Sequence, residues 1–274
     1  MKALGKDDPE LSEPLLARLR AEGLQIHEGA KVERVRTAEG GIVVEIASST
    51  RGTEVLTGTH LLVATGRKPN VEGLDLDAAG VKFDRRGVRV SSGLKTSNRR
   101  IFAIGDVTGS LQFTHVANYH AGIVIRRALF RYPATVNEAL VPWVTFTDPE
   151  LAHVGLAEDA ARKRHGRRIS IVRWPYSEND RAQTEHETEG FIKVVALPSG
   201  KILGATILGT QAGELIQMWS LAISAGLSLE HMAGYISPYP TLSEVNKRAA
   251  VNFFVPKLAN PLVRSAVRLL AKLG

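Results

Sequence analysis

A short apolar run that ends on a glycine and a carboxylate constrains this chain most strongly. Residues 101–104 read IFAI, the pattern of a buried strand, and Gly105 and Asp106 follow directly. A buried carboxylate without a partner is costly and shifts its pKa until it is neutral. Asp106 must therefore either cap the next turn, through Thr108 or Gly109, or bind a group that carries hydroxyl or amide donors.

A second apolar run of the same kind ends in a glycine loop. Residues 60–66 read HLLVATG, and the turn residues Pro69 and Asn70 follow. In α/β folds, ligands bind at the sheet edge where such strands end. We therefore expect both runs to be buried strands and their loops to lie at a ligand site.

The remaining pattern up to residue 138 predicts a helix, a small sheet and a second helix. Residues 8–24 have an amphipathic pattern that ends at Gly23, and residues 114–130 also have helical spacing. Between them, residues 25–47 alternate through two or three strands, with a hairpin turn at residues 40–41.

The character of the sequence changes near Ala139, where we place a domain boundary. Residues 141–156 predict a strand that leads into a turn and a helix. Residues 168–177 and 190–209 predict an antiparallel sheet, and residues 213–226 predict a helix on it. The apolar face of that helix, which carries Leu215, Met218, Trp219 and Ala222, belongs either to a two-fold interface or to the core of a single lobe.

The last fifteen residues, 260–274, predict a short basic amphipathic helix. Its apolar positions are Leu262, Val263, Ala266, Val267, Leu270 and Leu273. Such a helix can lie on a membrane surface. Of the two alternatives, we expect it to dock on its own protein or on a partner subunit instead.

Composition excludes several classes of function. The chain of 274 residues has no cysteine, which excludes disulfide scaffolds and thiolate metal sites within it and fits a reducing cytoplasm. No stretch has the pattern of a signal peptide or of a membrane span. The net charge of +7 is mostly interspersed, and its densest run, residues 162–168, suits a helix C-terminus. We therefore expect no nucleic-acid partner and, since His115 and His120 lack ligand spacing, no metal site.

Four motifs together resemble one enzyme family. They are LLVATGRKPN at 61–70, IFAIGDVTG at 101–109, FTDPELAHVGL at 146–156 and YPTLSE at 239–244. In this order they resemble the flavin-dependent pyridine nucleotide-disulfide oxidoreductases, which include dihydrolipoamide dehydrogenase, glutathione reductase and mercuric reductase.

The resemblance implies a fold of class α/β plus α+β. Partial Rossmann-like lobes would be followed by an antiparallel dimerisation domain. It divides the chain into the end of an NAD(P)-binding domain (1–70), the end of an FAD-binding domain (71–138), a dimerisation domain (139–255) and the tail helix (256–274).

The resemblance also implies the cofactors FAD and NAD(P)H and the residues that contact them. Asp106, next to Gly105, would accept hydrogen bonds from the ribityl chain of FAD, and the start of the following helix would approach the flavin ring through Phe113, Thr114 and His115. The segment that joins the two lobes would place Gly66 and Arg67 near nucleotide phosphate, although an ordinary domain-crossing loop is the alternative. Val32 would lie near the adenine side of NAD.

In the last motif the sequence departs from the best-known family pattern. A histidine that precedes the proline, and a glutamate five residues later, form the acid–base pair of dihydrolipoamide dehydrogenase, whereas the matching positions here are Tyr239 and Glu244. Tyrosine is a poor base at neutral pH. Mercuric reductase resembles this chain in having tyrosine there, but its C-terminal vicinal cysteines are absent. The alternative is that Tyr239 packs in the proline-rich turn while Glu244 caps a helix through Arg248.

The family's G-x-G-x-x-G turns and its redox-active cysteine pair are not found in this sequence. We therefore expect a C-terminal portion of a homodimeric reductase, beginning midway through its NAD domain. The parent would pass electrons from NAD(P)H through flavin to a disulfide, a metal ion or another small-molecule acceptor. The alternative is a non-catalytic dimerisation or scaffold module left by truncation.

Overall fold

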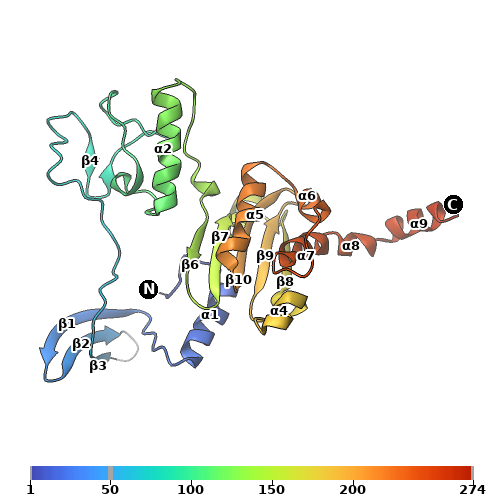
Figure 1. Ribbon diagram of the computed structural model, residues 1–274, viewed down its shortest axis with the longest axis horizontal. Helices are drawn as coiled ribbons and strands as arrows, with labels where there is room; N and C mark the ends of the chain where they lie inside the picture. Colours follow the sequence, from blue (N-terminus) through green and yellow to red (C-terminus); the bar gives the residue numbers. More distant parts are fainter. Residues whose placement is uncertain (1, 49–51, 273–274) are drawn as a thin grey trace. The chain divides into compact units, whose positions relative to one another are not determined.

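A computed structural model describes residues 2–48 and 52–272 of the chain. The chain divides into two compact units (Figure 1). One contains Met1–Thr59 together with Ala139–Gly274, and the other is His60–Glu138. The mixture of helices with antiparallel sheets agrees with the expected fold class. The four-part division into domains stays a prediction.

A five-stranded antiparallel sheet organises the larger unit. Its strands run in the order β6 (Trp143–Thr145), β7 (Glu150–Gly155), β10 (Ile202–Gly209), β9 (Phe191–Ala196) and β8 (Ser170–Pro175). The sequence pattern predicted this sheet, but it predicted a helix where β7 lies. Residues 151–154 are all buried, and a strand in the middle of a covered sheet has no polar face that would mark its period of two.

One face of the sheet carries the main hydrophobic core. Helix α5 (Ala212–Ser224) packs on β7 and β10, and helix α7 (Glu244–Asn252) packs on β8 and β9. The apolar face of α5 is buried in this core, where the indole of Trp219 donates a hydrogen bond of 2.7 Å to Asn246 Oδ1. Of the two alternatives for this helix face, dimer interface or core of a single lobe, the structure shows intramolecular core.

Helix α1 (Pro9–Ala21) covers the opposite face of the sheet. Its Leu11 and Leu15 pack against Leu151 and Leu208, as the predicted amphipathic pattern requires. Side chains alternate along β9, so Lys193 points to this face while its neighbours point into the main core. Between α1 and the sheet, the buried Lys193 ammonium forms ion pairs with Asp8 and Glu10 at the N-terminus of this helix.

The N-terminal part of the larger unit also contains a three-stranded antiparallel meander, in the order β1 (Ala30–Ala38), β2 (Gly41–Ser48) and β3 (Gly52–Gly58). The hairpin predicted at residues 40–41 joins β1 to β2, with Gly40 at φ +84°. The side chains of β1 are almost all exposed.

The smaller unit contains helix α2 (Thr114–Ala128), the 3₁₀ turn η1 (Gly105–Thr108) and a short hairpin of β4 (Phe83–Asp84) and β5 (Gly87–Val88). Leu94, Ile123 and Ala134 form its small core. Figure 1 shows α2 as its one long helix among the described residues of this unit.

The two apolar runs of this unit are not the buried strands that the sequence predicted. Residues 60–66, all described, lie outside any strand, and Leu62 is 89% exposed. Residues 101–104 are only half buried and make a single bridge, from Phe102 to Lys95. A strand needs hydrogen-bonding neighbours along its length, and no described strand lies alongside these two runs.

Short helices complete the larger unit. They are α3 (Glu158–His165), α4 (Asp180–Glu185), α6 (Leu229–Gly234), α8 (Val255–Leu258) and α9 (Pro261–Leu270), with 3₁₀ turns η2 (Glu138–Leu140), where the chain passes from the smaller unit to the larger, and η3 (Tyr176–Glu178). Among the described residues, none of the helices combines the length and the apolar character that crossing a membrane requires.

Candidate functional site

The turn at Gly105 is held tightly against helix α2. Gly105 has a φ of +64°, and a Cβ at this position would lie 2.9 Å from the Cβ of Ala117. Only glycine fits both the left-handed backbone and the close approach. The main-chain N–H of Gly105 donates a 3.1 Å hydrogen bond to Nδ1 of His120, on the same helix. The direction in which the next residue leaves the turn is therefore fixed.

The hydrogen bonds that close this turn do not involve the side-chain carboxylate of Asp106. The N–H of Gly109 is bonded at 3.0 Å to the main-chain carbonyl of Asp106, and the Thr108 hydroxyl donates to the Gly105 carbonyl at 2.8 Å. Those contacts are not to the Asp106 carboxylate, so the capping alternative is not what the structure shows. The Asp106 side chain is 44% exposed, and its Oδ2 lies 3.5 Å from Nη1 of Arg67.

Arg67 reaches this turn from the loop that the sequence singled out. It also donates to the main-chain carbonyl of Gln112, just before α2. Gly66 precedes it with a φ of +106°, and a Cβ added there would meet no atom within 4 Å, so the loop is open on that side. The structure thus brings together two segments 39 residues apart in sequence, as the ion pair between Arg67 and Asp106 records.

Helix α2 begins just after Gln112, whose carbonyl is bonded by the same Arg67 that pairs with Asp106, and the helix has no side-chain cap. Phe113 occupies the N-cap position with an extended backbone, and Thr114 is the first helical residue. The rings of Phe113 and His115 stack, with centroids 5.1 Å apart. A helix N-terminus without an acidic residue in its first turn attracts an anionic group.

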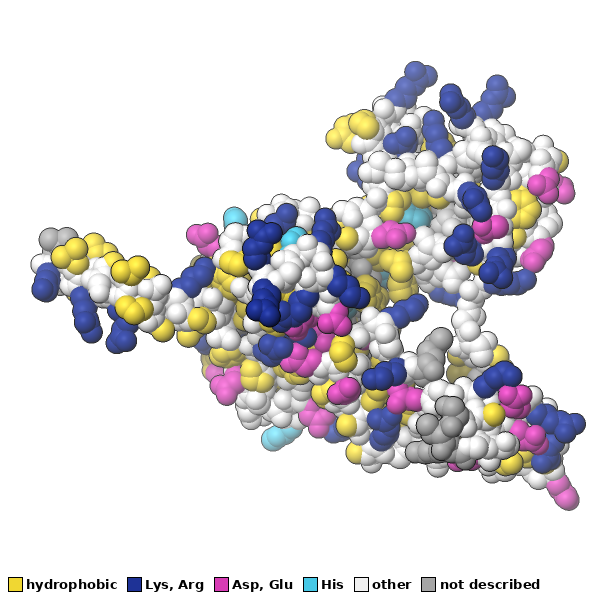
Figure 2. Space-filling model, turned by 180° about the vertical axis from the view of Figure 1, so that it is seen from behind, with side chains coloured by type: hydrophobic (Ala, Val, Ile, Leu, Met, Phe, Trp, Pro, Cys, Tyr) yellow, Lys and Arg dark blue, Asp and Glu magenta, His cyan; other side chains and the backbone are white. Residues whose placement is uncertain are grey.

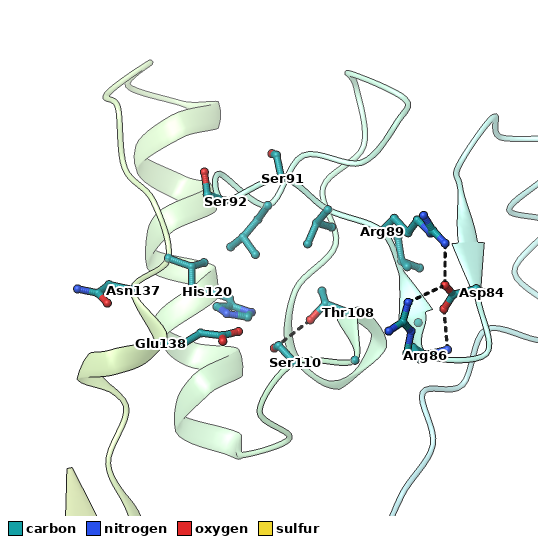
Figure 3. Close-up of a pocket in the computed structure, with 16 residues that line it drawn as sticks. Asp84, Arg86, Arg89, Ser91, Ser92, Thr108, Ser110, His120, Asn137 and Glu138 are labelled. Carbon is teal, nitrogen blue, oxygen red and sulfur yellow. Dashed lines mark hydrogen bonds and ion pairs between the residues drawn. The ribbon is translucent and has the colours of Figure 1, made fainter. Parts of the chain in front are cut away.

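A cavity of about 780 Å³ lies behind the turn, in the same unit (Figure 3). His120 lines it, 1% exposed, with Nε2 lacking a hydrogen-bond partner. Burial lowers the pKa of His120, although the charge of Glu138 opposes this shift. A neutral ring that accepts at Nδ1 carries its proton on Nε2.

Asp84 anchors the far side of this cavity. The pKa of Asp84 is lowered, chiefly by a hydrogen bond from the main-chain N–H of Arg86 and to a smaller extent by one from the Arg89 side chain. Desolvation opposes this shift but does not cancel it. The two arginines are both ion-paired with this one carboxylate, Arg89 at 3.0 Å and Arg86 at 3.8 Å. Figure 3 draws these contacts.

Val32 lies in the larger unit. It is on β1, 58% exposed, where the register of the β1–β2 ladder shifts between Val32 and Arg34. An exposed valine beside a strand irregularity is open to a ligand, and its predicted contact with NAD stays a prediction.

Tyr239 and Glu244 also lie in the larger unit, and the structure gives Tyr239 a partner that the sequence did not indicate. Its hydroxyl donates a 2.8 Å hydrogen bond to Asp180 Oδ2, at the start of α4. This bond, with the charge of Asp180, raises the pKa of Tyr239, and the charge of Glu244 adds to the shift. Glu244 is the first residue of α7. A tyrosine held in this way donates a hydrogen bond and does not act as a base.

Sequence reasoning missed the roles of His120 and Asp180. The sequence indicates for His120 only the role of a candidate metal ligand. In the described part of the chain, no three histidine, aspartate or glutamate side chains are grouped to hold a metal ion. Its contact with Gly105 joins residues 15 apart, and that of Tyr239 with Asp180 joins residues 59 apart. Neither spacing is a local pattern, so the sequence contains no signal for these contacts.

Comparisons with known proteins cover both units. The family model described as pyridine nucleotide-disulphide oxidoreductase matches residues 2–121, and that family's dimerisation domain matches residues 141–250. The mercuric reductase of Staphylococcus aureus is 39% identical over 249 residues, which are 90% of this chain and 45% of that protein. Dihydrolipoyl dehydrogenase 3 of Pseudomonas aeruginosa is 34% identical over 250 residues, which are 89% of this chain and 52% of that protein.

Solved structures agree with these relatives. The HOCl-induced flavoprotein disulfide reductase RclA of Escherichia coli superposes with a TM-score of 0.81 at 29% identity, over 89% of this chain and 56% of that one. The chain therefore spans about half the length of the relatives that it matches.

Proposed function

The chain belongs to the pyridine nucleotide-disulphide oxidoreductase family, and on this basis we propose that it supplies the C-terminal half of an FAD-dependent oxidoreductase. That enzyme passes electrons from NAD(P)H through flavin to a disulfide, a metal ion or another small acceptor. Residues 1–70 contribute the end of the NAD(P)-binding domain, residues 71–138 the end of the FAD-binding domain, residues 139–255 the dimerisation domain and residues 256–274 the tail helix.

The observation that carries this proposal is the half-exposed carboxylate of Asp106 beside the uncapped N-terminus of α2. A carboxylate that is free of its own turn can accept two hydrogen bonds from vicinal hydroxyl groups, such as those of a ribityl chain. Arg67 connects Asp106 to Gln112, just before the positive end of α2 at Thr114, and such a helix end stabilises negative charge. The residues present therefore fit the part of FAD that they would contact.

Bound FAD would supply two-electron transfer between the nicotinamide and the acceptor, and this chain's residues would position it. Gly105, held by His120, aims Asp106 outward. Arg67 is within reach of an anion, because its side chain is 63% exposed and its Nη1 is 3.5 Å from Asp106. Gly66 leaves space for a ligand beside the backbone.

The test is flavin retention by the complete protein that carries this chain. Asp106→Asn keeps the shape of the side chain and removes its charge, and we expect it to raise the FAD dissociation constant about tenfold or more, as for a charge-assisted hydrogen bond. Asp84→Asn is the matched control, since Asp84 is satisfied by Arg86 and Arg89 within its own hairpin. FAD is quantified by absorbance after dialysis, and equal retention by wild type and Asp106→Asn would contradict the proposal.

A homodimer is the partner arrangement that the dimerisation module favours. In the matched range 141–250, Phe146, Leu221 and Ile236 are between 66% and 92% exposed. Burying such side chains against a second copy is worth about 1.5–3 kcal/mol each. Light scattering at micromolar concentration should give twice the monomer mass. Leu221→Asp should lower that mass, whereas Leu62→Asp, also exposed but outside the module, should leave it unchanged.

A dimer that formed without any flavin binding would support the alternative function, a non-catalytic dimerisation module. Flavin content and mass measured on one preparation separate the two functions.

We place the protein in the cytoplasm, because a chain with no cysteine suits a reducing compartment.

A further inference from the structure

Helix α9 separates apolar and basic side chains onto opposite sides. With 3.6 residues per turn, Leu262, Ala266 and Leu269 lie along one side. Arg264 and Arg268 lie one turn apart on the other side, and Lys272 follows in the same row. Figure 2 shows the two stripes on the C-terminal segment, with dark blue side chains along one edge and yellow ones along the other.

No described part of the chain covers the apolar side of α9, so the docking on its own protein that the sequence led us to expect is not what the structure shows. None of the residues of this helix is buried, and Leu262, Leu269 and Leu270 are 79%, 63% and 65% exposed. The match to the family's dimerisation domain ends at residue 250. The helix therefore lies beyond the part of the chain that this module accounts for.

The charge around α9 has a single sign. From residue 245 to the last residue the chain has six cationic side chains and no aspartate or glutamate: Lys247, Arg248, Lys257, Arg264, Arg268 and Lys272. No carboxylate side chain of this stretch can pair with them. A surface that is both apolar and anionic would therefore complement both sides of α9.

A bilayer that contains anionic phospholipid combines these two properties at every point of its surface. A helix with leucines on one side and cations on the other lies in the interfacial plane, with its apolar side among the acyl chains and its cations at the phosphates. The cytoplasmic leaflet carries such lipid. We propose that α9 binds the surface of an anionic phospholipid bilayer without crossing it.

The preceding turn ties this helix to the folded unit. Phe253 is 8% exposed and belongs to the main core, and the Lys257 ammonium lies 4.4 Å from the centroid of its ring. Helix α8 follows at once, and Asn260 caps α9 by accepting a 2.9 Å hydrogen bond from the N–H of Leu262. Because the link between core and helix is short, the membrane would hold the folded unit close to its surface.

The expected affinity follows from the number of charges. Each lysine or arginine near an anionic surface adds on the order of fivefold to partitioning. Loss of two of them should therefore weaken binding on the order of 25-fold. Screening should weaken it further as the salt concentration rises.

The test is co-sedimentation of the full chain with vesicles. We expect binding to vesicles of three parts phosphatidylcholine and one part phosphatidylglycerol, little binding to phosphatidylcholine alone, and a loss of binding in high salt. The double variant Arg264→Gln/Arg268→Gln should bind on the order of 25-fold more weakly. The control Arg164→Gln/Arg167→Gln removes the same charge from exposed positions in the basic run at the end of α3, and it should bind like the wild type.

A third variant separates interfacial insertion from attraction of the whole basic chain. Leu262→Ser/Leu269→Ser keeps every charge, and it should also lose binding. The proposal is overturned if the wild type does not bind the anionic vesicles, if the two arginine variants bind equally, or if the leucine variant binds like the wild type. A change in molecular mass of the α9 variants without any lipid binding would assign the helix to a second copy of the chain and would overturn the proposal too.

Discussion

The Nδ1 atom of His120 accepts a hydrogen bond from the main-chain N–H of Gly105, across 3.1 Å. Gly105 is buried and sits in a left-handed turn that no other residue type fits without strain. The bond requires an unprotonated Nδ1, and burial keeps His120 neutral by lowering its pKa. One imidazole therefore determines where the candidate flavin-binding carboxylate, Asp106, points.

The stability of the chain should depend on this histidine and on pH. Because the pKa of His120 is lower in the folded state than its ordinary value of 6.5, its contribution is present above pH 6.5 and is lost as the pH falls through the folded value. His120→Leu should cost about 1–3 kcal/mol, since it leaves the Gly105 N–H unpaired. His120→Asn can still offer an acceptor oxygen and should cost less.

Urea unfolding between pH 8 and pH 5 measures both effects. The wild type should lose stability toward pH 5, and His120→Asn should lose less of it. His153 has a lowered pKa as well, chiefly from burial, so part of the pH dependence should survive in the variant. A pH dependence identical in wild type and His120→Asn would show that His120 does not titrate as expected.

The ion cluster below α1 should contribute to stability through its one lysine. The Lys193 ammonium, 3% exposed, lies 2.7 Å from Asp8, 2.8 Å from Glu10 and 2.7 Å from Glu158. Burial alone would lower the pKa of Lys193, but its hydrogen bonds to these carboxylates outweigh burial and raise it. Removing one partner of a buried ion cluster leaves uncompensated charge.

Lys193→Met should therefore lower the free energy of unfolding by about 3–5 kcal/mol. Lys163→Met is the control, because this exposed lysine lines the same surface pocket as Lys193, Asp8 and Glu158 and should change stability by about 0.5 kcal/mol or less. The measurement is urea unfolding at pH 7. Equal stability of the two variants would mean that the cluster is not a net contributor.

Acid should unfold the chain partly through the same cluster. The hydrogen bond from Arg173 is the main reason that the pKa of Glu10 is lowered from 4.5 to about 2. Lys193 adds to this shift, and desolvation opposes it. The stabilising effect of this carboxylate is complete above pH 4.5 and is lost as the pH falls toward 2.

Glu10→Gln should consequently be less stable than the wild type at pH 6, and the difference should shrink below pH 4.5. Circular dichroism along an acid titration follows this directly. Glu13→Gln, on an exposed side of the same helix, is the control and should track the wild type. A constant difference at every pH would mean that the charge of Glu10 is not the cause.

The parts of the fold that follow from local pattern were predictable, and the parts that follow from distant contacts were not. The leucines of α1 and the glycines of the β1–β2 hairpin determine those elements locally, and both predictions are confirmed. Residues 60–66 and 101–104 have the composition of buried strands, but a strand also depends on its neighbours. In the described chain those neighbours are not there, so the composition alone was misleading.

The candidate site divides in the same way. The turn at Gly105 and Asp106 and the loop at Arg67 were each expected at a ligand-binding edge, and the structure brings Arg67 and Asp106 within 3.5 Å. The residues that position them are set by tertiary packing. His120 reaches Gly105 from the second turn of α2, and Lys193 meets Asp8 across 185 positions of sequence.

Tyr239 should act by hydrogen-bond donation and not by base catalysis in the complete protein. Its hydroxyl, 2.8 Å from Asp180 Oδ2, has a raised pKa because of that contact. It therefore remains protonated at neutral pH, and its single O–H must leave Asp180 before it can be donated to the acceptor. Tyr239→Phe should lower turnover with the enzyme's acceptor about fivefold, the value of one hydrogen bond, without changing KM for NAD(P)H.

Asp180→Asn is the discriminating variant, because it weakens the hold on the tyrosine hydroxyl but leaves the hydroxyl in place. If Tyr239 donates to the acceptor, Asp180→Asn should retain most of the turnover that Tyr239→Phe loses. The parent enzyme should also be slow with dithiol substrates, since a donor that does not ionise near neutrality cannot take up the thiol proton. Stopped-flow reoxidation of the reduced flavoprotein measures both. Rapid dihydrolipoamide oxidation that Tyr239→Phe leaves unchanged would remove Tyr239 from the mechanism and leave it as a packing residue between Pro238 and Pro240.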